Sequence, residues 1–165
     1  MIEVQQLVKR YGKFTAVGGI NLSVATGEVY GFLGPNGAGK TTTLQMLAGM
    51  IKPTSGSITI GGFDLRKSPV EAKQITSMIP DRPYVYEKLT AVEFLRFVGG
   101  LYRMKASECA SRGRDLLKLF ELSERSGTLI ENFSHGMKQR LVFASALLTR
   151  PKLLIVDEPM VGLDP

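Results

Sequence analysis

Alternation of apolar and polar residues at the start of the chain predicts short β-strands. The alternation runs from Ile2 to Val8 and again from Gly19 to Val24, with a turn signal at Tyr11-Gly12-Lys13 between the two runs. A third run, Glu28 to Leu33, is apolar on both faces, which is typical of a buried strand in a parallel sheet. We therefore expect an N-terminal antiparallel β segment, followed by the first strand of a parallel sheet.

The remaining pattern alternates between helices and strands. It predicts strands at 57–60, 75–79 and 152–158, and helices at about 41–49, 91–103, 108–120 and 135–150. Thr90 and Glu93 have the spacing of a capping box, and Ser107 and Ser134 are expected to be N-caps. The fold class that follows is α/β with a mostly parallel core sheet, and the helices between about 88 and 150 form an insert between its two halves.

The most informative stretch lies between the predicted strand at 28–33 and the helix that follows it. It reads Gly34-Pro35-Asn36-Gly37-Ala38-Gly39-Lys40-Thr41 and matches the pattern G-x-x-x-x-G-K-[ST] in its required strand-to-helix context. Glycines allow backbone N–H groups to turn inward around a phosphate, the helix N-terminus adds its positive dipole end, and Lys40 adds a charge. The pattern therefore indicates a phosphate-binding loop, although an ordinary glycine-rich turn would share part of it.

Composition narrows the class of protein only a little. With 165 residues, 44% of them hydrophobic, the chain is long enough for one domain with a core. The net charge of +6 is spread along the chain, which favours a solvated surface over a nucleic-acid-binding patch. A single cysteine, Cys109, excludes an intrachain disulfide, and no apolar run is long enough to span a bilayer.

Acidic residues follow two of the predicted strands. Asp157 and Glu158 end the apolar strand at 152–158, where a double acid favours a bound cation or a proton-transfer role over a simple solvated strand end. Asp81 follows the strand at 75–79, at the end of an α/β sheet where ligands bind. Ser134 and Tyr11 have simpler explanations, since a serine N-cap or a surface tyrosine needs no ligand.

Taken together, these stretches resemble the nucleotide-binding domain of ATP-binding cassette (ABC) transporters over the whole chain. The family's elements occur in order: an aromatic loop at Tyr11, Walker A at 34–41, a Q-loop near Asp81, a signature at 133–137, Walker B ending at Asp157, and a D-loop at 163–164. The resemblance implies a phosphate-loop NTPase with a RecA-like core sheet, and residues 1–165 as one ATPase domain.

The same resemblance implies roles for individual residues. Tyr11 would stack on adenine, Lys40 would bind the β and γ phosphates, and Glu158 would polarise the attacking water, so that Glu158 and Lys40 are the catalytic residues. Magnesium would be held by Thr41, Asp157 and Asp81. The full set expected to bind ATP is Tyr11, Gly34, Pro35, Asn36, Gly37, Ala38, Gly39, Lys40, Thr41, Thr42, Ser134 and Gly136.

Three features depart from the family pattern. The signature is Phe133-Ser134-His135-Gly136-Met137 instead of L-S-G-G-Q, which resembles export-type members and leaves His135, the only histidine, as a tolerated variant. Asp81 stands where the family has glutamine, so its charge would slow hydrolysis or alter coupling to a partner. The chain stops after Asp164-Pro165, where family members continue into another core strand and a switch histidine, and we expect residues 1–165 to be an incomplete domain.

The partners implied by the resemblance are a transmembrane permease chain and a second nucleotide-binding domain paired head to tail, at the cytoplasmic face of the membrane. No nucleic-acid partner is expected. Two alternatives stay open: a soluble family member acting on ribosomes or DNA, and a nucleotide-gated binding module that does not hydrolyse ATP. Only 94 positions separate Lys40 from Ser134, without heptads, which argues against the coiled-coil members that act on DNA.

Overall fold

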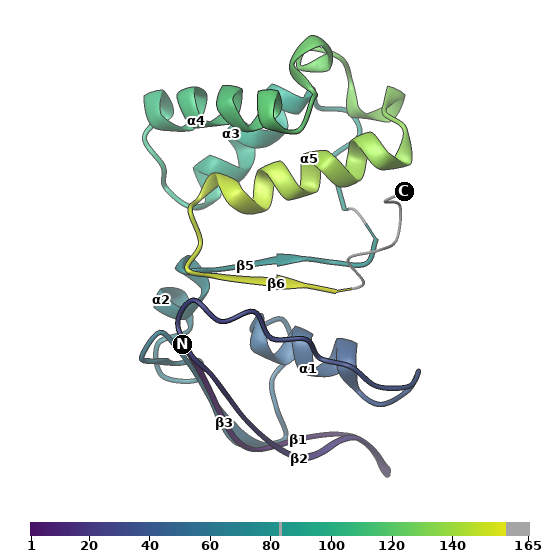
Figure 1. Cartoon of the computed structure of the whole chain (residues 1–165), viewed down its shortest axis with the longest axis vertical. Helices are drawn as coiled ribbons and strands as arrows, with labels where there is room; N and C mark the ends of the chain where they lie inside the picture. Colours follow the sequence, from purple (N-terminus) through teal and green to yellow (C-terminus); the bar gives the residue numbers. More distant parts are fainter. Residues whose placement is uncertain (83, 158–165) are drawn as a thin grey trace. The chain divides into compact units, whose positions relative to one another are not determined.

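A long antiparallel hairpin begins the chain in the computed structural model, which describes residues 1–82 and 84–157 (Figure 1). Strands β1 (Ile2–Tyr11) and β2 (Phe14–Val24) both extend beyond their predicted spans and meet at the turn Gly12-Lys13. Strand β3 (Ser55–Ile60) pairs with the other edge of β1, and the short β4 (Phe63–Asp64) pairs with β3. The result is a four-stranded antiparallel sheet in the order β2-β1-β3-β4.

Two helices complete the first of two compact units, Met1–Thr76. Helix α1 (Lys40–Leu47) follows the phosphate loop and agrees with the predicted helix, whereas α2 (Pro69–Gln74) is a short helix that periodicity does not predict. Apolar side chains from the sheet and from α1 are buried in this unit, because each element has one apolar face that must leave water. They include Leu7, Val17, Met46, Leu47, Ile58 and Ile60.

The strand predicted at 28–33 is absent from the structure. Residues Glu28–Leu33 have no regular secondary structure, and Val29 and Leu33 are 98% and 93% exposed. A buried parallel strand needs hydrogen-bonded neighbours, and no strand among the described residues pairs with this segment. The prediction of a buried strand is therefore wrong for the described chain, although the apolar pattern that suggested it is real.

Three helices dominate the second compact unit, Ser77–Pro165. They are α3 (Ala91–Leu101), α4 (Ala106–Leu119) and α5 (His135–Leu148). The short 3-10 helices η1 (Ser123–Arg125) and η2 (Ile130–Asn132) lie between α4 and α5. The capping box of α3 is confirmed: Glu93 N donates to Thr90 Oγ1 over 3.3 Å, and Thr90 N donates to Glu93 Oε2 over 2.8 Å. Ser107 is not an N-cap, because α4 begins at Ala106, immediately after the extended residue Lys105.

The three helices share one apolar core. Cys109 Sγ donates to the Leu95 carbonyl oxygen over 3.5 Å, and Arg112 donates to the carbonyls of Leu147 and Leu148, both over 2.7 Å, so α4 is tied to α3 and to α5. These helices lie within the insert predicted at about 88–150, and its limits as a domain stay a prediction. The core residues are Ala91, Phe94, Leu95, Cys109, Leu116, Leu117, Leu122, Ile130, Phe133, Leu141, Ala144 and Leu148.

A second sheet is formed by β5 (Thr76–Ile79) and β6 (Leu153–Val156), whose arrows point the same way in Figure 1. This parallel pair, together with the antiparallel sheet and the helices, confirms the α/β class. Ile155 is buried, whereas Leu154 is 38% exposed, so the two faces of β6 differ in burial. Asp157 N donates to the Ile79 carbonyl oxygen over 2.9 Å and continues the ladder at the carboxyl end of both strands.

Neighbouring glycines on α3 provide a test of how closely α3 and α4 pack. A Cβ on Gly99 would lie 2.4 Å from Cys109 Sγ and 3.3 Å from Cys109 Cβ, whereas one on Gly100 would meet nothing within 4 Å. We expect Gly99→Ala to lower the free energy of unfolding by about 1–3 kcal/mol through overpacking. Gly100→Ala should raise it by about 0.5–1 kcal/mol, because alanine loses less backbone entropy on folding. Urea denaturation of both variants measures the difference, and equal stabilities would contradict the close crossing.

Candidate functional site

The phosphate loop has the backbone conformation that its glycines predict at two of three positions. Gly37 and Gly39 have φ values of 83° and 82°, in the left-handed region that disfavours side chains. A Cβ on Gly39 would also lie 2.3 Å from the Ala16 carbonyl oxygen of β2. Gly34 differs from the expectation, because its φ is not positive and a Cβ there would make only an ordinary contact with Ala38 Cβ at 3.4 Å.

The first turn of α1 presents backbone donors without competing acids. The helix begins at Lys40, directly after the left-handed Gly39, and no acidic residue lies in its first turn. Thr43 folds back onto the loop, since its hydroxyl and its backbone N–H both donate to the Gly39 carbonyl oxygen over 2.8 Å. A helix N-terminus without a carboxylate in its first turn favours an anion such as phosphate.

Lys40 lies against the loop that it is predicted to serve. Its Nζ donates to the carbonyl oxygens of Gly34 at 2.6 Å and Pro35 at 3.0 Å, so the ammonium group is held at the loop itself. The next two threonines on α1 differ in exposure: Thr41, whose hydroxyl is the predicted magnesium ligand, is exposed, and Thr42 is half-buried. The loop residues Pro35, Asn36 and Ala38 are exposed as well, so a ligand can approach from solvent.

Tyr11 lies at the end of β1, opposite Phe14 at the start of β2. Its side chain is 51% exposed, and Lys9 Nζ lies 4.9 Å from the centre of its ring. Ala16, which contacts the loop at Gly39, is two residues along β2 from Phe14, a separation of roughly 7 Å. The hairpin therefore carries an exposed aromatic ring next to its turn, as the predicted contact with adenine requires.

The second unit brings together the two acids predicted to serve a magnesium ion. Asp157 is 6% exposed and follows β6, while Asp81 is half-buried and follows β5 two residues after Ile79. Because Asp157 N bonds to the Ile79 carbonyl, both acids lie at the same carboxyl edge of the parallel sheet. Mg²⁺ prefers oxygen ligands such as carboxylates, so Asp157 and Asp81 have the right chemistry for that ion, and the part predicted for Thr41 stays a prediction.

Ser134 is the N-cap of α5, as predicted, with its Oγ accepting a hydrogen bond from Met137 N over 3.3 Å. Ser134 is exposed, and nothing lies within 4 Å of the position of a Cβ on Gly136. Phe133, the first residue of the signature, is buried in the helical core and anchors the segment. The start of α5 is thus held by the buried Phe133, whereas Ser134 is exposed and the first turn has no acidic residue. These features suit contact with a phosphate.

An open pocket of about 610 Å³ joins Asp81 to the signature helix. Its walls include Arg82, Tyr84, His135 and Lys138, so Asp81 and His135, two of the residues that depart from the family pattern, line one pocket. Lys138 Nζ lies 2.5 Å from Glu87 Oε1, and this hydrogen bond and charge lower the pKa of Glu87. Sequence spacing does not reveal that Asp81 and His135 share a pocket, because the two segments are far apart in the chain.

Glu158, predicted to polarise the attacking water, lies outside the described residues, as does the D-loop at Leu163 and Asp164. Their roles stay predictions. Sequence reasoning also missed Thr43, Glu87 and Lys138, whose contacts support the loop and the signature helix. Thr43 could have been identified from its spacing, because a hydroxyl four residues after Gly39 can donate to the Gly39 carbonyl oxygen one helical turn earlier.

Comparison with known proteins identifies the class. The family model for ABC transporters matches residues 17–161, so the chain belongs to the ABC transporter family. It is 44% identical over 165 residues to the linearmycin resistance ATP-binding protein LnrL of Bacillus subtilis (strain 168), a match that covers 100% of this chain and 53% of LnrL. The chain thus spans about half the length of this relative.

Solved structures agree with this assignment. The structure of an ATP-binding subunit of an ABC transporter superposes with a TM-score of 0.91 at 36% identity, covering 100% of this chain and 69% of that one. The ATP-binding cassette MJ0796, solved as a dimer in a post-hydrolysis state bound to ADP and Pi, gives a TM-score of 0.86 at 26% identity over 99% of this chain and 76% of that one. The phosphate-loop ATPase fold is therefore established for this chain.

Proposed function

We propose that this protein is the ATP-binding and ATP-hydrolysing subunit of an ABC transporter. The observation that carries the proposal is the phosphate loop, in which left-handed Gly37 and Gly39 lead into an acid-free helix start beside the Lys40 ammonium group. The match of the family model to residues 17–161 supports the same assignment. Binding of ATP follows from the loop, and the family likeness links that binding to transport.

In the proposed mechanism, this chain's residues bind and orient ATP. The loop N–H groups and Lys40 hold the β and γ phosphates, Tyr11 stacks on adenine, and Glu158 holds the attacking water in line. Thr41, Asp157 and Asp81 would hold Mg²⁺, which neutralises phosphate charge when it is bound. Phosphoryl transfer needs little covalent chemistry from a protein, so placing charge and water supplies most of the catalysis.

We propose two partners, both at the cytoplasmic face of a membrane. One is a second nucleotide-binding domain, whose α5 start, with Ser134 and Gly136, would close over the nucleotide held by the first. The similar cassette MJ0796 was solved as a dimer, which supports pairing of two such domains. The other is a permease chain. Among the described residues, no helix has the length and hydropathy to cross a bilayer.

An aromatic surface on the second unit is the part we assign to the permease. Tyr86 and Phe97 pack edge to face with ring centres 5.0 Å apart and are 59% and 41% exposed, and Leu101 on α3 is 66% exposed. Large exposed aromatic side chains of this kind mark protein interaction sites. The name of LnrL, a resistance protein, and the export-like signature together favour an exporter.

Measurement of ATP binding and hydrolysis tests this proposal. We expect the protein, purified at its natural full length, to bind ATP with Mg²⁺, and Lys40→Ala to weaken binding at least about tenfold because a charge-assisted phosphate contact is lost. Lys67→Ala, which removes an exposed cation of the same unit, is the matched control and should bind normally. Equal ATP affinity in the wild type and in Lys40→Ala would contradict the assignment.

A further inference from the structure

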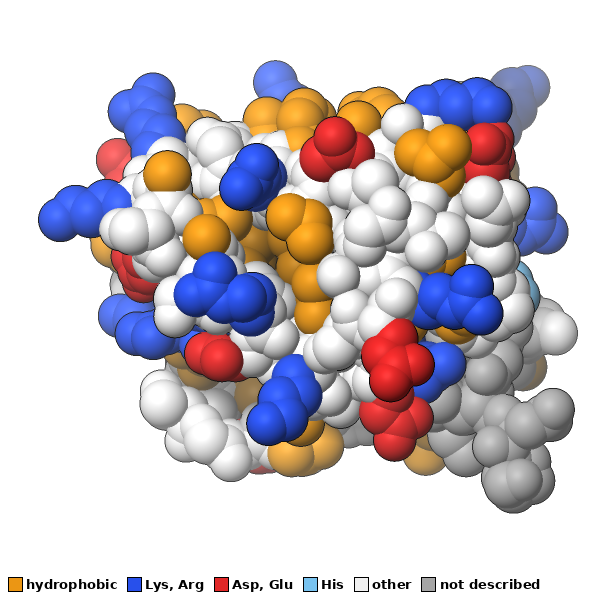
Figure 2. All heavy atoms as spheres, turned by 90° about the horizontal axis from the view of Figure 1, so that it is seen from above, with side chains coloured by type: hydrophobic (Ala, Val, Ile, Leu, Met, Phe, Trp, Pro, Cys, Tyr) orange, Lys and Arg blue, Asp and Glu red, His pale blue; other side chains and the backbone are white. Residues whose placement is uncertain are grey.

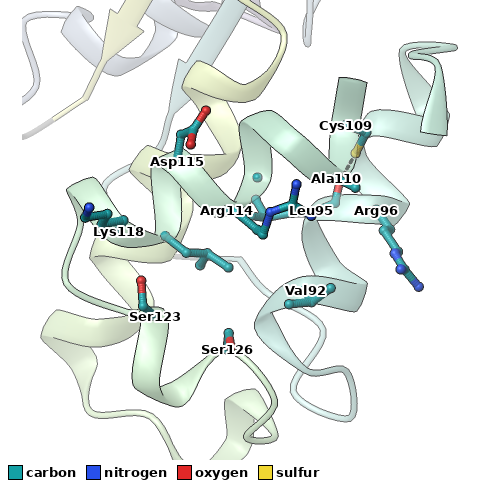
Figure 3. A pocket seen from close by; sticks show the side chains of 12 residues that line it. Val92, Leu95, Arg96, Cys109, Ala110, Arg114, Asp115, Lys118, Ser123 and Ser126 are labelled. Atoms are coloured by element: carbon teal, nitrogen blue, oxygen red, sulfur yellow. Dashed lines mark hydrogen bonds between the residues drawn. The ribbon is translucent and has the colours of Figure 1, made fainter. Parts of the chain in front are cut away.

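A cavity of about 470 Å³ opens between α3 and α4, away from every residue assigned to nucleotide binding. Its apolar wall comes from Val92 and Leu95 on α3 and from Ala110 and Leu117 on α4, while Gly113 leaves room because it has no side chain (Figure 3). This volume lies in the range of roughly 300–1,000 Å³ found for small-molecule sites, which are also mostly apolar with a few polar groups.

Charge around the cavity is predominantly positive. Arg96, Arg114 and Lys118 line it, against one lining carboxylate, Asp115. Within the part of the chain that the structure describes, none of these three cations forms a salt bridge. Figure 2 looks onto the outer face of the helices, where apolar surface lies between Lys and Arg side chains. An excess of cations beside an apolar recess favours an anion with an apolar body.

Two hydroxyl groups add hydrogen-bonding capacity at the same cavity. Ser123 of η1 and Ser126, which follows η1, line the wall and are labelled in Figure 3. Cys109 lies at another part of the wall, with its thiol bonded to the Leu95 carbonyl oxygen. The cavity therefore combines an apolar interior, cationic groups and hydroxyls from three segments of the same unit.

We propose that this cavity binds a small amphiphilic anion, an aliphatic chain with a carboxylate or similar head group. The apolar chain lies along Leu95 and Leu117, and the anionic head meets Arg114 and Lys118. A small molecule fits better than a docked peptide helix, because the volume of about 470 Å³ is that of a small-molecule site and the lining residues come from α3, α4 and the η1 region. The site is separate from the phosphate loop and goes beyond ATP binding.

Calorimetric titration of the full-length protein with decanoate, and with decanol as the uncharged analogue, tests the proposal. We expect decanoate to bind with millimolar affinity or tighter, and the double variant Arg114→Gln/Lys118→Gln to weaken it at least about tenfold through loss of two charged contacts. Asp115→Asn should strengthen decanoate binding, because it removes the carboxylate that repels the anion. Decanol affinity should change little in all these variants.

Controls separate this site from general effects of charge. Arg125→Gln removes one exposed cation from η1 that does not line the cavity, and it should leave decanoate affinity unchanged. Absence of decanoate binding, equal affinity in the double variant, or binding of an acidic peptide in place of decanoate would each overturn the proposal.

Discussion

Gly39→Ala is expected to abolish ATP binding and to destabilise the first unit by at least about 2 kcal/mol. The new Cβ would lie 2.3 Å from the Ala16 carbonyl oxygen, and the residue would have to keep a φ of 82° that disfavours alanine. Either the loop separates from β2 or α1 begins at a different residue, and in both cases the N–H groups that face the phosphates move. Urea denaturation and ATP titration measure the two effects.

Gly37→Ala is the matched control for this substitution. Gly37 has nearly the same φ, 83°, but a Cβ there meets nothing within 4 Å. Gly37→Ala should therefore lower the free energy of unfolding by only about 1 kcal/mol, the cost of placing alanine in the left-handed region. It should retain measurable ATP binding. If both variants lost the same stability and affinity, the contact with Ala16 would have no role, and backbone conformation alone would explain the requirement for glycine.

Glu158→Gln is expected to lower ATP hydrolysis by about 10²–10³-fold while ATP binding stays near normal. Glutamine has almost the same shape as glutamate but cannot accept a proton or carry the charge that orients water. The measurement is phosphate release under saturating ATP, paired with a binding titration in the same buffer. Near-normal turnover would remove the role assigned to Glu158.

A second comparison distinguishes turnover from binding. Lys40→Ala should lose both, since its ammonium group lies at the loop carbonyls of Gly34 and Pro35 and would contact the phosphates directly. Glu158→Gln should lose only turnover. If Glu158→Gln weakened ATP binding as much as Lys40→Ala does, the acid would hold the nucleotide and would not act on the attacking water.

Local signals in the sequence predicted the structure well. Each correctly predicted feature depends on residues only a few positions apart, so the local sequence is enough to predict it. These features are the left-handed Gly37 and Gly39, the capping box at Thr90 and the N-cap at Ser134. Ser107 failed as a cap because a serine near a helix start need not occupy the capping position, and here the extended residue is Lys105. The helix α2 was missed although Ser68-Pro69 is a helix-start signal.

Features that depend on distant partners were harder to predict. The strand at 28–33 requires neighbours that no local pattern specifies, and the described residues provide none. The pocket that joins Asp81 to His135 unites segments more than 50 positions apart, and the recess beside Gly113 depends on how α3 and α4 cross. Periodicity shows which faces are apolar, but it does not show which element covers each face.

The exposed apolar run Val29–Leu33 has a consequence for the protein during synthesis. Five residues with four large apolar side chains and no charge resemble the short segments that start intermolecular β-aggregation when they remain unpaired. Glu28 and Pro35 flank the run closely, and a charge and a proline at such positions act as gatekeepers against strand addition. Until a neighbouring strand pairs with it, a nascent chain would depend on these two flanking residues, or on a chaperone, to stay soluble.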